Sequence, residues 1–125
     1  MDPYRYGSAA GRYEARGHNW TLVVTQDAIF LRDQVGEGHL EYAGPVPEPR
    51  VLESGIWYEG ELVREYVVAG LVEQDVLPYV LTITERPCVD EEGRVSPTSV
   101  DWAFGPAAHQ AAGCGGEFPR ADSKL

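Results

Sequence analysis

Basic residues are scarce in this sequence. Lysine and arginine together number 10 against 20 aspartates and glutamates, which gives a formal net charge of −10. Proteins that bind nucleic acid depend on Lys and Arg contacts to phosphate, so this balance argues against a nucleic-acid partner. It argues equally against a basic patch for an anionic membrane surface. A soluble domain fits the charge, as does a domain with a cationic partner.

Long apolar runs are also missing. No stretch of 18 apolar residues occurs, so the sequence predicts no transmembrane helix. The beginning of the chain has neither the basic region nor the apolar region of a signal peptide. Two interpretations stay open: a cytoplasmic protein, or an exported one whose signal segment is absent from this sequence.

Cysteine and histidine are too few and too far apart for a metal site. Cys88 and Cys114 are the two cysteines, and they form no C-x-x-C pair. His18, His39 and His109 have no second ligand at metal-binding spacing, so we expect surface or loop histidines and no cofactor. Turn-forming Pro or Gly flanks each cysteine, which suits a disulfide in an oxidising compartment. Two free buried thiols are the alternative.

Length and composition indicate one folded domain. The chain has 125 residues, of which 43% are hydrophobic and 24% charged, as in ordinary globular domains. We predict a flexible arm at residues 1–11, one domain over residues 12–116 and a flexible tail at residues 117–125.

Alternating apolar and polar residues predict many short strands. In residues 79–85, Tyr79, Leu81 and Ile83 share one face, which predicts a central strand. In residues 100–104 the same alternation points Trp102 towards the core. The other predicted strands cover residues 12–17, 20–25, 28–32, 39–42, 50–53, 56–58, 61–68 and 110–113.

The pattern between the strands defines the fold class. Glu59-Gly60 is predicted as a turn, residues 44–49 with three prolines as an extended crossing, and residues 70–78 as the best place for a helical turn. No helical pattern of 10–15 residues occurs. We therefore predict an all-β domain, a small antiparallel barrel of about seven or eight strands with at most one short helical turn.

Candidate chemistry is weak. Cys88 or Cys114 could pair with His109 as a nucleophile and base, but that pairing competes with the disulfide. Asp90, Glu91 and Glu92 could hold a cation such as calcium. The 12-residue calcium loop is absent, however, and Gly93 favours an ordinary turn. We predict no catalytic residues, no metal and no enzyme activity.

One pair of aromatic residues suggests a binding site. Trp57 and Tyr58 are adjacent, so on a strand they point to opposite faces and one should lie outside the barrel. Glu59 and Glu61 follow them. Trp57, Tyr58, Glu59 and Glu61 are therefore the candidate binding residues, with simple packing in the barrel as the alternative.

Three segments carry a resemblance to a known family. They are residues 15–22 (ARGHNWTL), residues 81–90 (LTITERPCVD) and residues 113–116 (GCGG). Together they resemble a family of uncharacterised bacterial envelope proteins, small and often lipid-anchored domains that sometimes occur beside META-type domains. The sequence departs from the pattern of that family at two points. The family's Glu-Pro-Gly segment before the tryptophan is shortened to His18-Asn19, and its Met-Ser pair after the aspartate is replaced by Glu91-Glu92.

The resemblance implies an all-β fold, a Cys88–Cys114 disulfide and a periplasmic or cell-envelope location, with a cytoplasmic location as the alternative. It allows a lipid anchor upstream of Met1 and implies no established activity. The leading hypothesis is a non-enzymatic envelope domain that binds a ligand or a basic protein. The alternative is an inhibitor of a cationic cell-wall hydrolase such as lysozyme, because a charge of −10 would steer that association.

Overall fold

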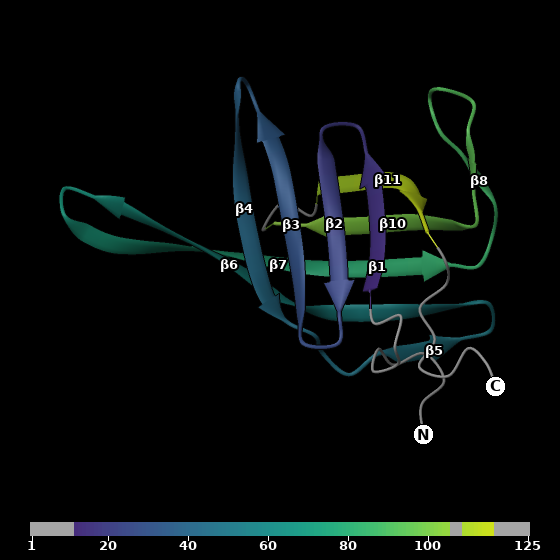
Figure 1. Cartoon of the computed structure of the whole chain (residues 1–125). Coiled ribbons are helices and arrows are strands. Elements are labelled where there is room, and N and C mark those ends of the chain that lie inside the picture. Colours follow the sequence, from purple (N-terminus) through teal and green to yellow (C-terminus); the bar gives the residue numbers. More distant parts are fainter. Residues whose placement is uncertain (1–11, 106–108, 117–125) are drawn as a thin grey trace.

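The computed structural model describes residues 12–105 and 109–116, and it is built from β-strands (Figure 1). The predicted arm at residues 1–11 and the predicted tail at residues 117–125 lie outside the described residues. In the described part of the chain no helix is long and apolar enough to cross a membrane. The strands are β1 (Arg12–Gly17), β2 (Trp20–Thr25), β3 (Ala28–Val35), β4 (Gly38–Pro45), β5 (Arg50–Leu52), β6 (Gly55–Val68), β7 (Leu71–Thr84), β8 (Cys88–Val89), β9 (Val95–Ser96), β10 (Thr98–Phe104) and β11 (His109–Gly115).

Eight antiparallel strands close into a barrel. Their order is β4-β3-β2-β1-β11-β10-β7-β6, and a pairing of Ala43 with Val63 joins β4 back to β6. Strand β5 is an extra strand that pairs with β6. The prediction of an all-β barrel with seven or eight strands is therefore confirmed.

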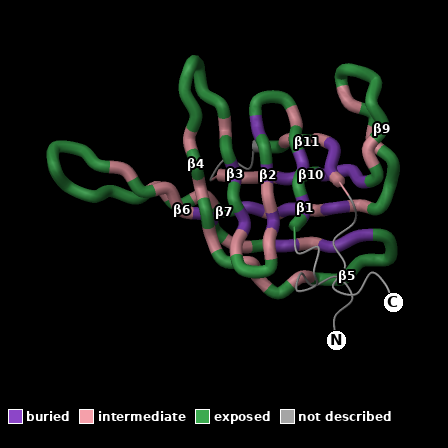
Figure 2. The backbone as a smooth tube through the Cα atoms, in the orientation of Figure 1, coloured by how far each residue is buried: buried purple, intermediate pink, exposed green. Residues whose placement is uncertain are grey.

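The barrel interior is filled by side chains of its own strands. Trp20 and Trp102 are 7% and 3% exposed, and their rings pack with centroids 5.8 Å apart. Tyr79 and Phe104 pack on the other sides of Trp102. Buried segments follow the barrel strands, and the projecting segments are exposed (Figure 2). The rest of the buried apolar core is Tyr13, Ala15, Leu22, Val24, Ile29, Leu31, Ile56, Tyr58, Leu62, Leu81, Ile83 and Val100.

Two predictions about the middle of the chain are wrong. Residues 70–78 contain no helical turn and belong mostly to β7, and Glu59-Gly60 is no turn but part of β6. The two strands pair without a break along their whole length, and the hairpin turns at Ala69-Gly70, where both residues have positive φ. Gly60 packs closely, because a Cβ there would lie 3.3 Å from the Tyr79 hydroxyl.

Two hairpins project from opposite ends of the barrel (Figure 1). The first, which we call the ribbon, comprises residues 63–76 at the ends of β6 and β7. The second, which we call the flap, comprises residues 86–97 and contains β8 and β9. These two short strands pair only with each other, as a separate two-stranded sheet. The flap therefore depends on other contacts to fix its position, whereas the ribbon continues β6 and β7.

Candidate functional site

The four candidate binding residues do not lie together. Tyr58 is 1% exposed and belongs to the core. Trp57 points the opposite way and is half-buried under the Arg50 guanidinium, whose carbon lies 4.0 Å from the ring centroid. The outward aromatic is thus already covered by a side chain of β5, and Tyr58 is inaccessible from outside.

Glu59 and Glu61 share the outward face of β6 with Trp57. They line a surface pocket of about 390 Å³ with residues of β7 and the end of β10, such as Pro78 and Ala103. Both glutamates are exposed. The structure therefore places three of the four predicted residues on one face, and their binding role stays a prediction.

A different pocket forms between the flap and the outer wall of the barrel. It has a volume of about 480 Å³, within the range of small-molecule sites. We call it the flap pocket. Its lining comes from β1, β10 and β11 on the barrel side and from residues 86–94 on the flap side: Arg16, Gly17, His18, Arg86, Cys88, Val89, Asp90, Glu91, Glu92, Arg94, Ser99, Val100, Asp101, Ala112, Gly113 and Cys114.

A disulfide between Cys88 and Cys114 fixes the flap to the barrel. The two Cα atoms are 5.4 Å apart, which is ordinary for a disulfide, and the described residues contain no free cysteine. Cys114 lies on β11 and Cys88 on β8, so the bridge joins the wall to the flap. Ser99 adds a hydrogen bond by donating to the Arg86 carbonyl at 3.1 Å. The proposed cysteine nucleophile is therefore excluded, because neither sulfur is available as a thiolate.

The glycines beside Cys114 are required by the barrel interior. A Cβ on Gly113 would lie 2.2 Å from the Arg16 carbonyl oxygen and 2.8 Å from the Trp20 ring. A Cβ on Gly115 would lie 1.8 Å from the Tyr13 hydroxyl. Because side chains alternate along a strand, the inward positions must be glycine and Cys114 faces out towards the flap.

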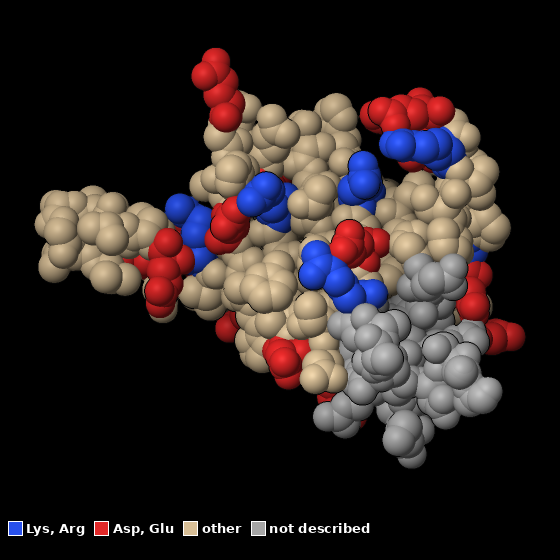
Figure 3. All heavy atoms as spheres, viewed as in Figure 1, with Lys and Arg blue, Asp and Glu red and all other residues tan. Residues whose placement is uncertain are grey.

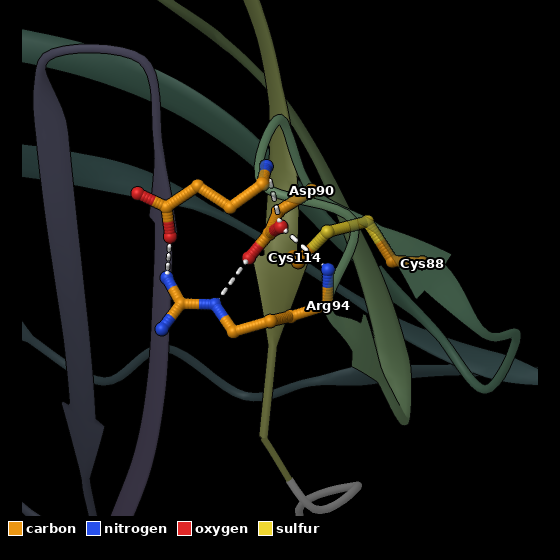
Figure 4. Close-up of polar contacts among 5 residues, drawn as sticks. Cys88, Asp90, Arg94 and Cys114 are labelled. Carbon is orange, nitrogen blue, oxygen red and sulfur yellow. Dashed lines mark hydrogen bonds and ion pairs between the residues drawn. A yellow bond between two sulfur atoms is a disulfide. The ribbon is translucent and has the colours of Figure 1, made fainter.

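The acidic end of the flap is an ordered turn (Figure 4). Asp90 Oδ1 accepts hydrogen bonds from the backbone N–H groups of Arg94 and Glu92, each at 2.9 Å. Arg94 also donates through Nε to Asp90 and pairs with Glu92. The backbone N–H of Arg94, with further contacts from Glu92 and the Arg94 side chain, holds the pKa of the Asp90 carboxyl below its usual range.

This arrangement accounts for the acidic cluster without a metal. Asp90 and Glu92 already bind Arg94, and Glu91 lies 3.7 Å from His18. Among the described residues, no group of three or more His, Cys, Asp or Glu side chains is placed to hold a metal ion. The cluster instead shapes the flap.

Two arginines of the flap pocket remain without an ion pair. Arg94 is neutralised by its neighbours, whereas Arg16 from β1 and Arg86 from the start of the flap form no salt bridge with any described residue. Asp101 on β10 is also unpaired within that part of the chain. Among the described residues, the pocket therefore presents two arginines and one aspartate without an ion pair near the disulfide.

Sequence patterns could not single out Arg16 and Arg86, because they lie 70 positions apart on β1 and on the flap. The available signal was the cysteine pair: a Cys88–Cys114 bridge lays the segment after Cys88 against the outer face of β11. Fold and site together define a disulfide-linked β-barrel domain with a charged pocket on its outer wall. Comparisons with known protein families, with curated proteins and with solved structures find no match to this chain.

Proposed function

We propose that this chain is a non-enzymatic binding domain of the bacterial envelope and that its ligand occupies the flap pocket. The observation that carries the proposal is the disulfide that holds a charged flap over the outer wall of the barrel. A pocket fixed by a covalent link is preorganised, which lowers the entropic cost of binding. An oxidising compartment would keep that link intact, which supports a periplasmic or cell-envelope location.

The filled interior directs the proposal to the outer surface. Small β-barrels bind ligands inside only when their interior leaves space. Here Trp20 and Tyr79 both pack against Trp102 within the barrel. A ligand would therefore bind outside, where the flap adds a second wall.

The free charges suggest the ligand class. Arg16 and Arg86 can form charge-assisted hydrogen bonds with a carboxylate or another small anion. Asp101 and the net charge of −10 disfavour a polyanion. We propose a small ligand that carries a single anionic group, such as a short peptide with a free C-terminus.

A thermal-shift and NMR titration tests this function. The probe is N-acetyl-alanyl-alanine, and the control ligand is its C-terminal amide. The free acid should raise the Tm and shift the backbone resonances of the flap, and the amide should not. Arg16→Gln and Arg86→Gln should each weaken binding, whereas Arg12→Gln, which alters an exposed arginine paired with Glu14 outside the pocket, should not. Equal responses to acid and amide would remove the proposal.

A second candidate is an inhibitor of a cationic cell-wall hydrolase, which the excess of 10 acidic residues favours through electrostatic steering. Its test is lytic activity of a basic lysozyme in the presence of the protein. Inhibition that weakens as salt rises would support it. Unchanged activity at micromolar excess would eliminate it.

A further inference from the structure

The ribbon carries a face of exposed valines. Val63 pairs with Val76 and Val67 pairs with Val72, so these four side chains lie on one face, which we call the valine face. Val67 and Val72 are each 68% exposed, and Val76 is 49% exposed. Between the two valine pairs lies a single polar pair, in which Gln74 donates to Glu65 at 3.1 Å.

The remaining charges of the ribbon lie on the opposite face. Arg64 and Asp75 form an ion pair at 2.8 Å, and the Arg64 guanidinium carbon lies 4.3 Å from the centroid of the Tyr66 ring. Glu73 lies on the same side by strand alternation. Figure 3 shows the end of the ribbon as an uncharged surface, with charged side chains only nearer the barrel. The sorting is incomplete, because Glu65 lies on the valine face and the exposed Val68 and Leu71 lie on the opposite face.

The valine face continues into a mainly apolar hollow on the barrel. The hollow has a volume of about 500 Å³ and lies on the outside of β2, β3, β4 and β6. Val23, Phe30 and Ala43 contribute apolar side chains to it, and Phe30 is 47% exposed. The ion pair of Arg32 with Glu41 also lines the hollow. Val63 belongs both to the hollow and to the base of the ribbon, so the two surfaces form one apolar strip.

We propose that this strip is the interface of a twofold dimer. In it the ribbons of two copies lie antiparallel, and the valines at the end of each ribbon enter the hollow at the base of the other. A twofold interface requires a patch that is complementary to itself. Here an apolar tip and an apolar hollow lie at the two ends of one strip, so one rotation brings each tip to the partner's hollow.

The size of the surface fits a weak interface between two copies. The valine face has six residues and the hollow nine, with Val63 in both, so 14 residues per copy are fewer than the ~20–30 that a standard interface uses on each side. A two-stranded hairpin is also marginally stable alone in water, and here the described chain offers the ribbon no third strand beyond Val63. Packing of two ribbons would bury both valine faces.

This surface differs from the flap pocket, because the flap and the ribbon project from opposite ends of the barrel (Figures 1 and 2). A dimer built through the ribbons would leave both flap pockets open. The inference therefore does not depend on the ligand proposed above.

Sedimentation equilibrium over a range of protein concentrations tests the dimer. The wild-type protein should show a monomer–dimer equilibrium that tightens as salt is added, because salt screens the repulsion between two copies of charge −10. The double variant Val67→Ser/Val72→Ser should raise the dimer Kd by at least about tenfold, since it removes buried apolar area. Phe30→Ser in the hollow should also weaken the dimer.

The matched control is Val68→Ser/Leu71→Ser. These residues are 51% and 66% exposed and pair beside the turn, but on the other face of the ribbon. The control should leave the dimer Kd unchanged, and near-UV circular dichroism should show that all variants keep the folded barrel. A wild-type protein that stays monomeric at every concentration overturns the proposal. An equal effect of both double variants would also overturn it. So would a dimer that weakens as salt is added, because that dependence would indicate an interface held by opposite charges.

Discussion

At the scale of single residues, Trp102 is the centre of the barrel core. It is 3% exposed and contacts the rings of Trp20, Tyr79 and Phe104. Trp102→Ala should lower the free energy of unfolding by ~3–5 kcal/mol, because it removes a large buried side chain and leaves a cavity. Urea denaturation followed by circular dichroism measures this loss.

Its neighbour Asp101 supplies the control, since it points outwards and is exposed. Asp101→Asn should change the unfolding free energy little, within ~0.5 kcal/mol. Equal losses for the two variants would contradict the assigned faces of β10.

Two buried tyrosines differ in how their hydroxyls are satisfied. Tyr13 bonds to Thr98 at 2.7 Å, whereas the Tyr79 hydroxyl is buried with no hydrogen-bond partner among the described residues. Tyr13→Phe should therefore cost ~0.5–1.5 kcal/mol of stability, and Tyr79→Phe should be neutral or stabilising. Chemical denaturation of the two variants compares them directly.

The fall of stability at alkaline pH gives an independent test of the burial of Tyr79. Burial raises the pKa of Tyr79 to about 12, so the folded state keeps its proton while the unfolded chain releases it near ~10. The contribution of Tyr79 is thus fully present below pH ~10 and is lost as pH rises through the folded pKa. Tyr79→Phe should flatten the fall of stability with pH, and an unaltered alkaline limb would contradict this.

At the scale of elements, the disulfide positions the flap more than it closes the barrel. β11 pairs with both β1 and β10 through backbone hydrogen bonds, whereas β8 and β9 pair only with each other. Removing a bridge with a sequence separation of 26 should cost ~3.5 kcal/mol in the chain-entropy account. Cys88→Ser/Cys114→Ser should therefore keep the barrel and release the flap.

NMR of this variant, together with thiol titration, tests the bridge. The core resonances of the barrel should persist, while the flap amides lose protection and the flap pocket loses its ligand response. The unreduced, denatured wild-type protein should show no free thiol. A variant whose flap amides stay as protected as before would show that other contacts hold the flap.

Most strands could be predicted from the sequence, but their partners could not. Alternation located residues such as Tyr79, Leu81 and Ile83 on the inner face, because that signal lies within one strand. The length of β7 was missed because residues 70–78 are stabilised by pairing with β6, and local composition does not encode that partner. The same limit applies to the site. One of Trp57 and Tyr58 points outwards as predicted, but that residue is Trp57, and its cover by Arg50 depends on the register of β5.

At the scale of the whole molecule, the closed barrel separates two projecting hairpins. The barrel has a closed ladder of eight strands around an aromatic core. The flap is attached by one covalent bridge, and the ribbon by continuation of β6 and β7. Acidic side chains are distributed over several elements of the visible face and do not form one patch (Figure 3). This arrangement assigns the proposed ligand site and the proposed dimer surface to different ends.

Native-state hydrogen exchange should reveal this division. Amides that pair within the barrel, such as those of Leu22 and Leu81, should exchange only through global unfolding, because they lie in a closed ladder over a buried core. Amides of the flap, and of the ribbon in dilute protein, should exchange through local opening at a lower free energy. Reduction of the disulfide should remove the protection of the flap, speed the exchange of barrel amides only as far as the loss of global stability requires, and leave the ribbon unchanged. Higher protein concentration should slow exchange in the ribbon and leave the flap unchanged. Uniform protection along the chain, or a response of both hairpins to either treatment, would contradict the independence of the two ends.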